Sequence, residues 1–311
     1  MNLLEKALND YLRIRRSLGF RLQEQESYLR NFVAFLQVEG ASYITTELAL
    51  RWATQCAKAQ LSTKAERLGM VRRFASWCSA AESRTEIPPA GLLPHPYRRK
   101  PPYIYADAEI QRLLRQAQQL PSSKGLRAAT IMTLLGLLAV TGMRVSEAVS
   151  LDREDVDLDR GILHIRHGKC GKSRYVPVHP SAVVALRKYT MARNRLFPAP
   201  LIPAFFLSER GRRITAQTAR YTFAKLSQRL GLRVPAKGSG RGPRLHCLRH
   251  RFAVRTLIHW YRAGLDVERE IPKLATYLGH VHVNDTYWYL EAVPELLQLA
   301  TDRVIRREVR P

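Results

Sequence analysis

Four side chains near the end of the sequence have the types and the order needed for chemistry on a phosphate ester. His246 and Arg249 lie in the segment His-Cys-Leu-Arg-His, His280 follows thirty residues after that segment, and Tyr289 completes the set. A phenol is a poor nucleophile at neutral pH because its ordinary pKa is about 10. Cations around the attacked group compensate by stabilising the charge that develops there. The set therefore indicates cleavage of a phosphodiester by a tyrosine without a metal ion, if further cations are present.

The overall charge indicates a polyanionic partner. The 311 residues include 51 Lys and Arg against 26 Asp and Glu, which gives a net charge of +25. The apolar content of 46% and charged content of 25% are those of an ordinary globular protein. A ribosomal or membrane-surface protein could share this charge balance, but nucleic acid is the leading candidate.

The positive charge is concentrated around the histidine-arginine segment. From Arg210 to Leu265 the sequence has fourteen Lys or Arg residues and no Asp or Glu. An ordinary solvated surface intersperses both signs, whereas a run of one sign focuses a field on a ligand. Single-stranded RNA recognition usually needs aromatic stacking surfaces, and no such aromatic-rich strand occurs here. Duplex DNA is therefore favoured over RNA as the partner.

Cysteine usage and hydropathy predict a cytoplasmic protein that is not embedded in a membrane. The four cysteines are scattered without a paired spacing, and the first residues carry no secretion signal, which favours free thiols in a reducing compartment. The longest apolar stretch, residues 131–141, has eleven residues. A membrane-spanning helix needs about 20, so this stretch predicts a buried core helix.

Residues 1–85 are expected to form a helical DNA-binding domain. Apolar residues recur at helical spacing in residues 4–14 and 28–36, and glycines follow both segments. Thr45 or Thr46 is a candidate N-cap for a third helix, and Ser62 and Thr63 are candidates for a fourth. Arg67, Arg72 and Arg73 give the fourth helix a basic face. That face is either simply solvated or in contact with phosphates.

A proline-rich basic linker is expected at residues 86–104, followed by a second domain at residues 105–311. Six prolines between 88 and 102 forbid a regular helix, and Arg98, Arg99 and Lys100 add three charges. Asp107 is a plausible N-cap for the next helix.

The second domain is expected to be mainly helical with a small β-sheet. An apolar helix at 127–140 ends at Gly142, and Arg144 opens the next turn. Alternating apolar residues predict strands at 162–165 and 175–178, joined by a turn at 168–172. Helices follow at 181–195 and 215–230, residues 238–243 predict a loop, and residues 291–311 predict a final helix.

Four segments of this domain and a tyrosine after the last of them resemble, in their order, the five sequence motifs of the tyrosine recombinases, the phage-integrase family. The segment Thr141–Glu147 is similar to the first arginine motif, and Gly168–Val178 to the β-hairpin lysine segment. His246–His250 resembles the H-x-L-R-H motif, and Leu278–His280 with a tyrosine nine positions later resembles the last motif. The helical first domain looks like the core-binding domain of that family, and the second like its α+β catalytic domain.

The resemblance implies a site-specific recombinase that cuts and rejoins duplex DNA through a 3′-phosphotyrosyl intermediate, without ATP, cofactor or metal. Arg144 and Arg249 would clamp the scissile phosphate, and Tyr289 would attack it. Lys169 would protonate the leaving 5′ oxygen. His246 would assist with the proton of the nucleophile, and His280 would bind the phosphate. The basic residues expected to contact DNA are Arg67, Arg72, Arg73, Arg98, Arg99, Lys100, Lys172, Arg174, Arg241 and Arg244.

Several assignments have alternatives. Arg144 could merely pair with Glu147, and Glu147 is expected to orient an arginine. Lys172 competes with Lys169 for the role of general acid. His250 could be a packed core histidine and is assigned a supporting role. Tyr287 and Tyr289 both follow His280 and would point to different faces of a helix, and the family spacing selects Tyr289. His280 and His282 could suggest a metal pair, but no carboxylate or cysteine cluster accompanies them.

The helical domain begins almost at Met1, as in two-domain Xer-type and transposon-borne recombinases. We therefore expect integration, excision or transposition of a mobile element. The enzyme would act as a tetramer on paired sites, with or without related recombinases. The apolar side of the final helix would dock on a neighbouring protomer or pack within its own chain. A catalytically silent DNA binder and a type IB topoisomerase are the rival functions.

Overall fold

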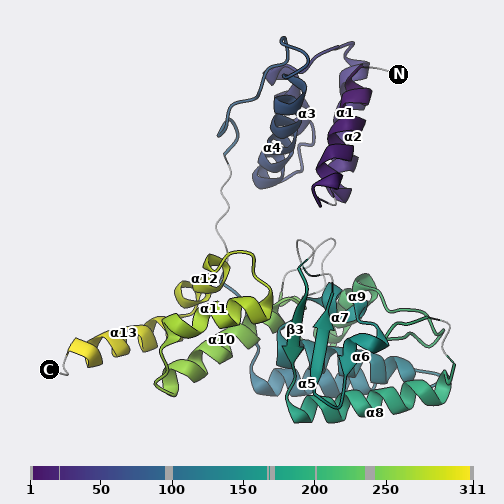
Figure 1. Cartoon of the computed structure of the whole chain (residues 1–311), viewed down its shortest axis with the longest axis vertical. Helices are drawn as coiled ribbons and strands as arrows, with labels where there is room; N and C mark the ends of the chain where they lie inside the picture. Colours follow the sequence, from purple (N-terminus) through teal and green to yellow (C-terminus); the bar gives the residue numbers. More distant parts are fainter. Residues whose placement is uncertain are drawn as a thin grey trace. The chain divides into compact units, whose positions relative to one another are not determined.

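The computed structural model describes residues 3–20, 22–94, 101–166, 168, 172–199, 202–234 and 242–308. The chain divides into two compact units, residues 1–99 and 100–311 (Figure 1). The expected linker at 86–104 spans this division, although residues 95–100 lie outside the described residues. The predicted fold class, mainly helical with a small sheet, is confirmed.

Unit 1 contains four helices around one apolar core. They are α1 (Leu3–Ser17), α2 (Gln23–Val38), α3 (Thr46–Thr54) and α4 (Leu61–Cys78). The core includes Leu8, Phe32, Trp52 and Phe74, one from each helix and all almost fully buried. Helical spacing of apolar residues explains this arrangement, because each helix turns one apolar stripe toward the others.

Two of the three predicted helix caps were misplaced. The Thr45 side chain accepts a hydrogen bond from the Leu48 amide (3.2 Å) and caps α3 as predicted. Helix α4, however, begins at Leu61, before Ser62 and Thr63, and the extended Gln60 precedes it without a side-chain cap. The helix α5 has Ala106 as its N-cap in place of Asp107. The Asp107 carboxylate instead binds Arg251 and Arg255, so tertiary ion pairs replace the local cap.

The first half of unit 2 packs helices around a three-stranded antiparallel sheet. The helices are α5 (Asp107–Gln118), α6 (Leu126–Thr141), α7 (Val145–Ser150), the short 3₁₀ helix η1 (Arg153–Asp155), α8 (Pro180–Leu196) and α9 (Ala216–Arg229). The strands are β1 (Val156–Asp157), β2 (Ile162–Ile165) and β3 (Arg174–Pro177), in the order β1-β2-β3. Leu163 pairs with Val176 across β2 and β3, and both are fully buried in the apolar core of unit 2. The two predicted strands are present; the two-residue β1 was not predicted.

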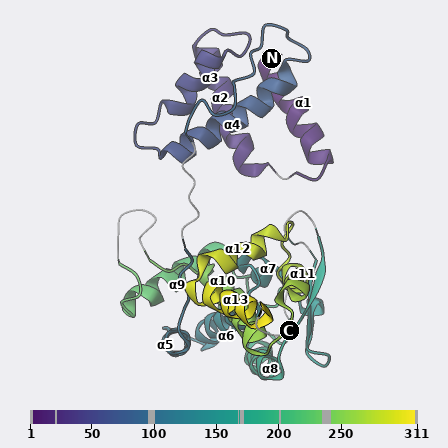
Figure 2. The same ribbon diagram turned by 90° about the vertical axis from the view of Figure 1, so that its left-hand side faces the viewer.

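The second half of unit 2 is a helical bundle with its own core. It contains α10 (Cys247–Arg262), α11 (Val267–Leu278), α12 (Asn284–Ala292) and α13 (Pro294–Glu308). Figure 2 shows these helices facing the viewer, with α12 and α13 next to α10. Leu257, Ile271 and Tyr289 lie in this core. The apolar helix α6 also contacts α10, and this contact joins the two halves.

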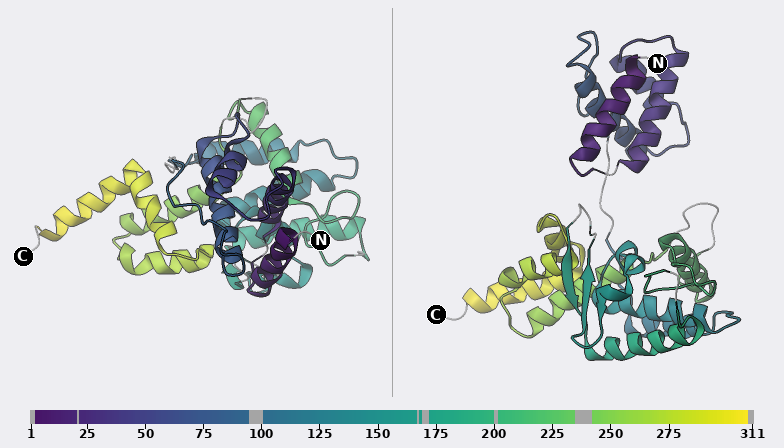
Figure 3. Two further views of the ribbon diagram at one scale, coloured as in Figure 1. Left: turned by 90° about the horizontal axis from the view of Figure 1, so that it is seen from above. Right: turned by 45° about the vertical axis from the view of Figure 1, so that its right-hand side comes forward.

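The final helix predicted at 291–311 is in fact interrupted at Val293. Val293 has extended backbone angles (φ −126°, ψ 112°), so α12 ends before it and α13 starts at Pro294. The residue before a proline is disfavoured in the helical region, which explains the break. Leu296 is buried, whereas Leu297 and Val304 are exposed as α13 extends away from the body of the unit (Figure 3).

Within the described residues, no helix is long and apolar enough to cross a membrane. The described cysteines Cys56, Cys78 and Cys247 are free thiols, and Cys170 lies outside the described residues.

Gly142 sets the course of the backbone that leads to Arg144, two residues later. It ends α6 in the left-handed region (φ 61°), and a Cβ there would lie 2.6 Å from the Phe252 ring. We expect Gly142→Ala to lower the free energy of unfolding by about 1–3 kcal/mol, through backbone strain and this clash. Urea unfolding of the intact chain measures the change.

Gly136→Ala is the matched control in the same helix. A Cβ at Gly136 would meet only Leu114, at an ordinary 3.9 Å. This substitution should raise stability by up to about 1 kcal/mol, because alanine is the better helix former. Equal effects of the two substitutions would refute a special role for the left-handed Gly142.

Candidate active site

Three arginines from three different elements bind the end of α11. Each donates to one of three consecutive main-chain carbonyls. The pairs are Arg174 Nε to Tyr277 O (2.8 Å), Arg249 Nη2 to Leu278 O (2.8 Å) and Arg144 Nη2 to Gly279 O (3.0 Å). The last carbonyls of a helix lack intrahelical partners and carry the negative end of the helix dipole. The sequence separation between these groups is large, so only the tertiary fold brings them together.

Glu147 joins two of these arginines. Its carboxylate accepts from Arg144 Nη1 (2.8 Å) and from Arg174 Nη1 and Nη2 (3.1 and 2.8 Å). It also accepts from the Arg144 amide (2.8 Å), which fixes the start of α7. Burial alone would raise the pKa of Glu147, but the bonds to Arg174 and Arg144 outweigh it and hold the pKa below its usual range. The expectation that Glu147 contacts an arginine is met with two arginines.

Arg249 is the most deeply buried of the three cations. It is 2% exposed and also donates from Nη1 to Gly142 O (2.9 Å). Burial, together with the charge of Arg144, lowers its pKa to about 10. It stays charged at neutral pH. Its two terminal nitrogens thus each donate to a main-chain carbonyl, one at the end of α6 and one at the end of α11.

The cluster of Arg144, Arg174 and Arg249 has more positive than negative charge. Among the described residues, the three guanidinium groups share one carboxylate, Glu147, and each also binds a neutral main-chain carbonyl. Burying charge is costly unless it is compensated. An oxyanion with several acceptor oxygens would supply both the missing charge and the missing acceptors.

Tyr289 lies on α12, and its side chain is buried in the core of the helical bundle. It is 2% exposed, and its hydroxyl lies 3.0 Å from His250 Nδ1. Tyr287 on the same helix is 38% exposed. The two tyrosines do point to different faces, and Tyr289 is the one directed toward α10, which carries Arg249.

Two further histidines, His246 and His280, belong to the candidate site beside Tyr289 and His250. His246, the N-cap of α10, is exposed, and its ring meets that of His250 edge to face at 4.7 Å between centroids. His280 directly follows the C-cap residue Gly279, whose φ is 70°. His280 Nδ1 lies 2.7 Å from Oγ1 of the fully buried Thr286, which orients the ring.

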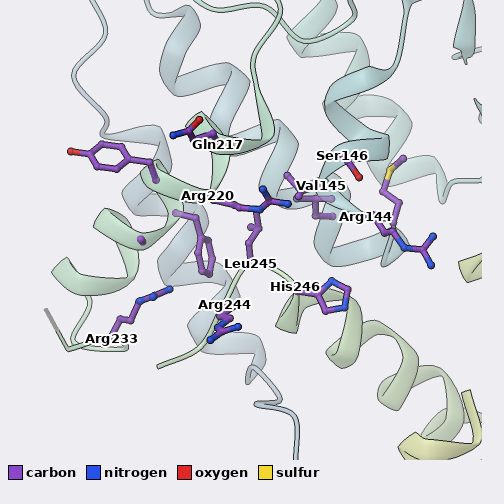
Figure 4. Close-up of a pocket in the computed structure, with 14 residues that line it drawn as sticks. Arg144, Val145, Ser146, Gln217, Arg220, Arg233, Arg244, Leu245 and His246 are labelled. Carbon is purple, nitrogen blue, oxygen red and sulfur yellow. The ribbon is translucent and has the colours of Figure 1, made fainter. Parts of the chain in front are cut away.

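A cationic cleft of about 660 Å³ opens beside the arginine cluster. Arg144 and His246 lie at one side of it, and Arg220, Arg233 and Arg244 line the rest (Figure 4). Among the described residues that line the cleft, several are apolar and none is acidic. Arg220 and Arg233 were not singled out from the sequence, although the one-signed run from 210 to 265 contains both.

The residues expected to contact DNA occupy different environments. Arg73, Lys172 and Arg244 are exposed, and Arg72 is half-buried. Arg67 lies over the rings of Tyr28 and Trp52, at 5.2 and 5.8 Å. Arg174 is mostly buried in the cluster described above. Lys169, Arg98, Arg99, Lys100 and Arg241 lie outside the described residues.

No group of three or more His, Cys, Asp or Glu residues suited to a metal ion occurs among the described residues.

Comparison with known proteins places these observations in a family. Residues 104–295 match the phage integrase family. The chain is 46% identical to the integrase/recombinase y4rB of Sinorhizobium fredii, over 99% of this chain and 98% of that protein. It is 30% identical to the tyrosine recombinase XerD of Neisseria meningitidis serogroup B, over 95% of this chain and 90% of that protein.

Solved structures share the fold at low sequence identity. The Tn1549 transposon integrase in complex with transposon right-end DNA has a TM-score of 0.65 at 15% identity, covering 98% of this chain and 99% of that one. XerH recombinase in a post-cleavage complex with a difH substrate has a TM-score of 0.64 at 19% identity, covering 88% and 76%.

The burial of Tyr289 can be tested by chemical modification. In the absence of DNA, tetranitromethane should nitrate Tyr287 much faster than Tyr289, because the Tyr289 ring is inaccessible. Fragmentation mass spectrometry distinguishes the two sites, with Tyr287→Phe as the control that removes the fast product. Equal nitration of both tyrosines would contradict the buried position.

The lowered pKa of Glu147 predicts a pH-dependent stability. The carboxylate stabilises the fold above its ordinary pKa of 4.5, and this contribution is lost as the pH falls through its lower native pKa. At pH 7, Glu147→Gln should cost about 3 kcal/mol of unfolding free energy, because it leaves two arginines uncompensated.

The difference between wild type and Glu147→Gln should shrink as the pH falls below 4.5. The control Glu154→Gln, at an exposed ion pair with Arg166, should have little effect at any pH. A Glu147→Gln effect of the same size at pH 3 and pH 7 would show that the charge of Glu147 is not what matters.

Proposed function

The chain belongs to the phage integrase family of tyrosine recombinases, and we propose that it cuts and rejoins duplex DNA through a covalent bond between Tyr289 and a 3′ phosphate. The observation that carries this proposal is the excess positive charge of Arg144, Arg174 and Arg249 next to the bundle that holds Tyr289. Family membership supports the class of reaction, and the geometry of the cluster supports the assignment of residues.

In the proposed reaction the arginines stabilise charge on the phosphate. The Tyr289 oxygen attacks phosphorus and loses its proton, the bond from phosphorus to the 5′ oxygen breaks, and that oxygen takes up a proton. Arg144 and Arg249 donate to the non-bridging oxygens, whose negative charge is most concentrated as the fifth oxygen approaches. Guanidinium suits this role because it is planar, permanently charged and bidentate.

The proton transfers are assigned to the neighbouring groups. His246, whose ring packs against that of His250, assists with the phenol proton. His280, held by Thr286, binds the phosphate. Lys169, with Lys172 as the competing residue, protonates the leaving 5′ oxygen. Attack by a 5′ hydroxyl from a second duplex reverses the step and joins the strands without ATP, because the ester bond retains the energy.

The Tyr289 side chain must leave its buried position before its hydroxyl can react. Its hydroxyl bonds to His250 and its ring is buried among Leu257, Ile271 and Leu296. We propose that DNA binding shifts α12 so that the hydroxyl moves from His250 to the phosphate held by the arginines. The extended Val293 between α12 and α13 is a break at which such a shift can occur.

The duplex is proposed to lie along the cationic cleft and to contact unit 1 as well. Arg220, Arg233 and Arg244 line the cleft with Arg144, and Arg72 and Arg73 supply charge on α4. The linker cations Arg98, Arg99 and Lys100 and the loop residue Arg241 are assigned to the DNA backbone from the sequence.

The active assembly is proposed to be a tetramer on paired sites, acting on a mobile element in the bacterial cytoplasm. The lambda integrase is known as a dimer on a core site and as a tetramer on a Holliday junction. Leu297, Val304 and Ile305 expose apolar surface on α13, which suits docking on a neighbouring protomer. Leu296 and Arg303 at the same time pack α13 on its own chain, through the apolar core and Leu265 O.

A nicked suicide duplex tests the reaction. Oligonucleotides are made from inverted repeats that flank the gene, with a nick that lets the cleaved fragment dissociate and traps the covalent product. Wild type and Tyr287→Phe should form an adduct that survives denaturing electrophoresis. Tyr289→Phe should form none while it still binds the DNA.

The other outcomes separate the rival functions. An adduct lost in Tyr287→Phe but kept in Tyr289→Phe would overturn the assignment of the nucleophile. Binding without an adduct in wild type would indicate a silent DNA binder. Relaxation of a supercoiled plasmid that lacks the paired sites would indicate a topoisomerase.

A further inference from the structure

We propose that Arg174 is a positioning residue that holds the phosphate-binding Arg144 in place, and that it does not itself contact DNA. This inference rests on the proposed function and adds to it a residue whose sequence position, next to Lys172, suggests a direct DNA contact. The sequence shows that Arg174 carries a charge, whereas its contacts and burial define what that charge does.

All three nitrogens of the Arg174 guanidinium are bonded inside the protein. Nη1 and Nη2 bind the two oxygens of Glu147 (3.1 and 2.8 Å), and Nε binds Tyr277 O (2.8 Å). The side chain of Arg174 is 10% exposed and that of Glu147 is 2% exposed. A cation in this position has little surface to offer to a phosphate. The bidentate pair instead fixes the plane of the Glu147 carboxylate.

The fixed carboxylate of Glu147 in turn fixes the position of Arg144. Glu147 Oε1 accepts from both Arg174 Nη1 (3.1 Å) and Arg144 Nη1 (2.8 Å), so one oxygen lies between the two guanidinium groups. Oε2 accepts from the Arg144 amide (2.8 Å) as well as from Arg174 Nη2. Loss of Arg174 would free the carboxylate to rotate and would let Arg144 pair fully with it. Arg144 would then be turned toward Glu147 and away from the phosphate.

Gly279 makes the close approach of Arg174 possible. A Cβ at residue 279 would lie 2.7 Å from Arg174 Nη1 and 2.9 Å from its Cζ. The same glycine offers its carbonyl to Arg144 (3.0 Å). The absence of a side chain at this position therefore serves both arginines, and His280 follows directly.

Arg174 also ties the sheet to α11. It is the first residue of β3 and pairs with Ile165 of β2. At the other end of β3, the Tyr277 hydroxyl donates to Pro177 O (3.2 Å). Two contacts through Tyr277 thus fix β3 on the helix whose end binds the arginine cluster.

The test compares Arg174→Gln and Arg174→Lys with the control Arg166→Gln. Arg166 directly follows β2 but pairs with Glu154 and Asp155, and not with Glu147. Single-turnover adduct formation is measured on the nicked suicide duplex, and DNA affinity is measured as a function of salt concentration. A second duplex carries a methylphosphonate at the scissile position, where a methyl group replaces one non-bridging oxygen and removes the negative charge.

A positioning role predicts a specific pattern. Both substitutions of Arg174 should slow adduct formation by roughly 100-fold, since misplacing a reactive group by about 1 Å costs about that much. Lysine should not rescue the rate, because it cannot form the bidentate bond. On the methylphosphonate duplex the loss should be much smaller, because a neutral phosphorus depends less on the arginines. In an Arg144→Ala background, Arg174→Gln should slow the reaction no further.

A direct DNA contact predicts the opposite. Arg174→Gln would then reduce the slope of log affinity against log salt by about 1, and Arg174→Lys would restore it. Either that result or a normal rate in Arg174→Gln would overturn the proposal. A merely structural role would slow both substrates equally and would also overturn it. If Arg174→Gln does not fold, Arg174→Lys, which keeps the charge, carries the same comparison. No adduct in wild type would be a failure of the proposed function and not of this inference.

Discussion

The site depends on one arrangement, in which three main-chain carbonyls at the end of α11 and one shared carboxylate, Glu147, hold three arginines without cancelling all of their charge. A separate carboxylate for each guanidinium group would have neutralised the cluster. Main-chain oxygens of Tyr277, Leu278 and Gly279 orient them while leaving the cluster positive. The electrostatic field is therefore in place before DNA arrives, and little reorganisation is needed when charge develops on phosphorus. This preorganisation costs free energy, because it requires a charged guanidinium to be buried. The same burial lowers the pKa of Arg249.

The rest of unit 2 serves this arrangement. The apolar helix α6 ends at Gly142, whose left-handed backbone sets the position of Arg144 and whose carbonyl binds Arg249. α11 ends at Gly279 in the same conformation and presents the carbonyls. The proposed nucleophile lies in a separate core, with the Tyr289 hydroxyl 3.0 Å from His250 Nδ1. In the proposed mechanism, burial of the phenol keeps it from reacting until DNA is bound.

The sequence predicted the parts of the fold that depend on local pattern, because helical periodicity marks helices and alternating apolar residues mark β2 and β3. Arg144, Arg249, His280 and Tyr289 were identified through the resemblance of short motifs to those of a known family, and their catalytic roles stay predictions. Arg174 was expected on the DNA because charge is visible in a sequence and burial is not. Its pairing with Glu147, 27 residues away, requires the fold. The break at Val293 was missed although Pro294 was visible, and β1 was missed because two residues carry no periodic signal.

The central claim is that the arginine cluster makes a phosphate attackable by Tyr289. The most direct measurement is the structure of the Tyr289→Phe variant bound to its intact DNA site. The account predicts that Arg144 and Arg249 each donate to a non-bridging oxygen of the scissile phosphate, with the substituted ring beside that phosphorus and displaced from His250. A scissile phosphate bound elsewhere on the cationic cleft, with the cluster of Arg144, Arg174 and Arg249 left empty, would contradict it.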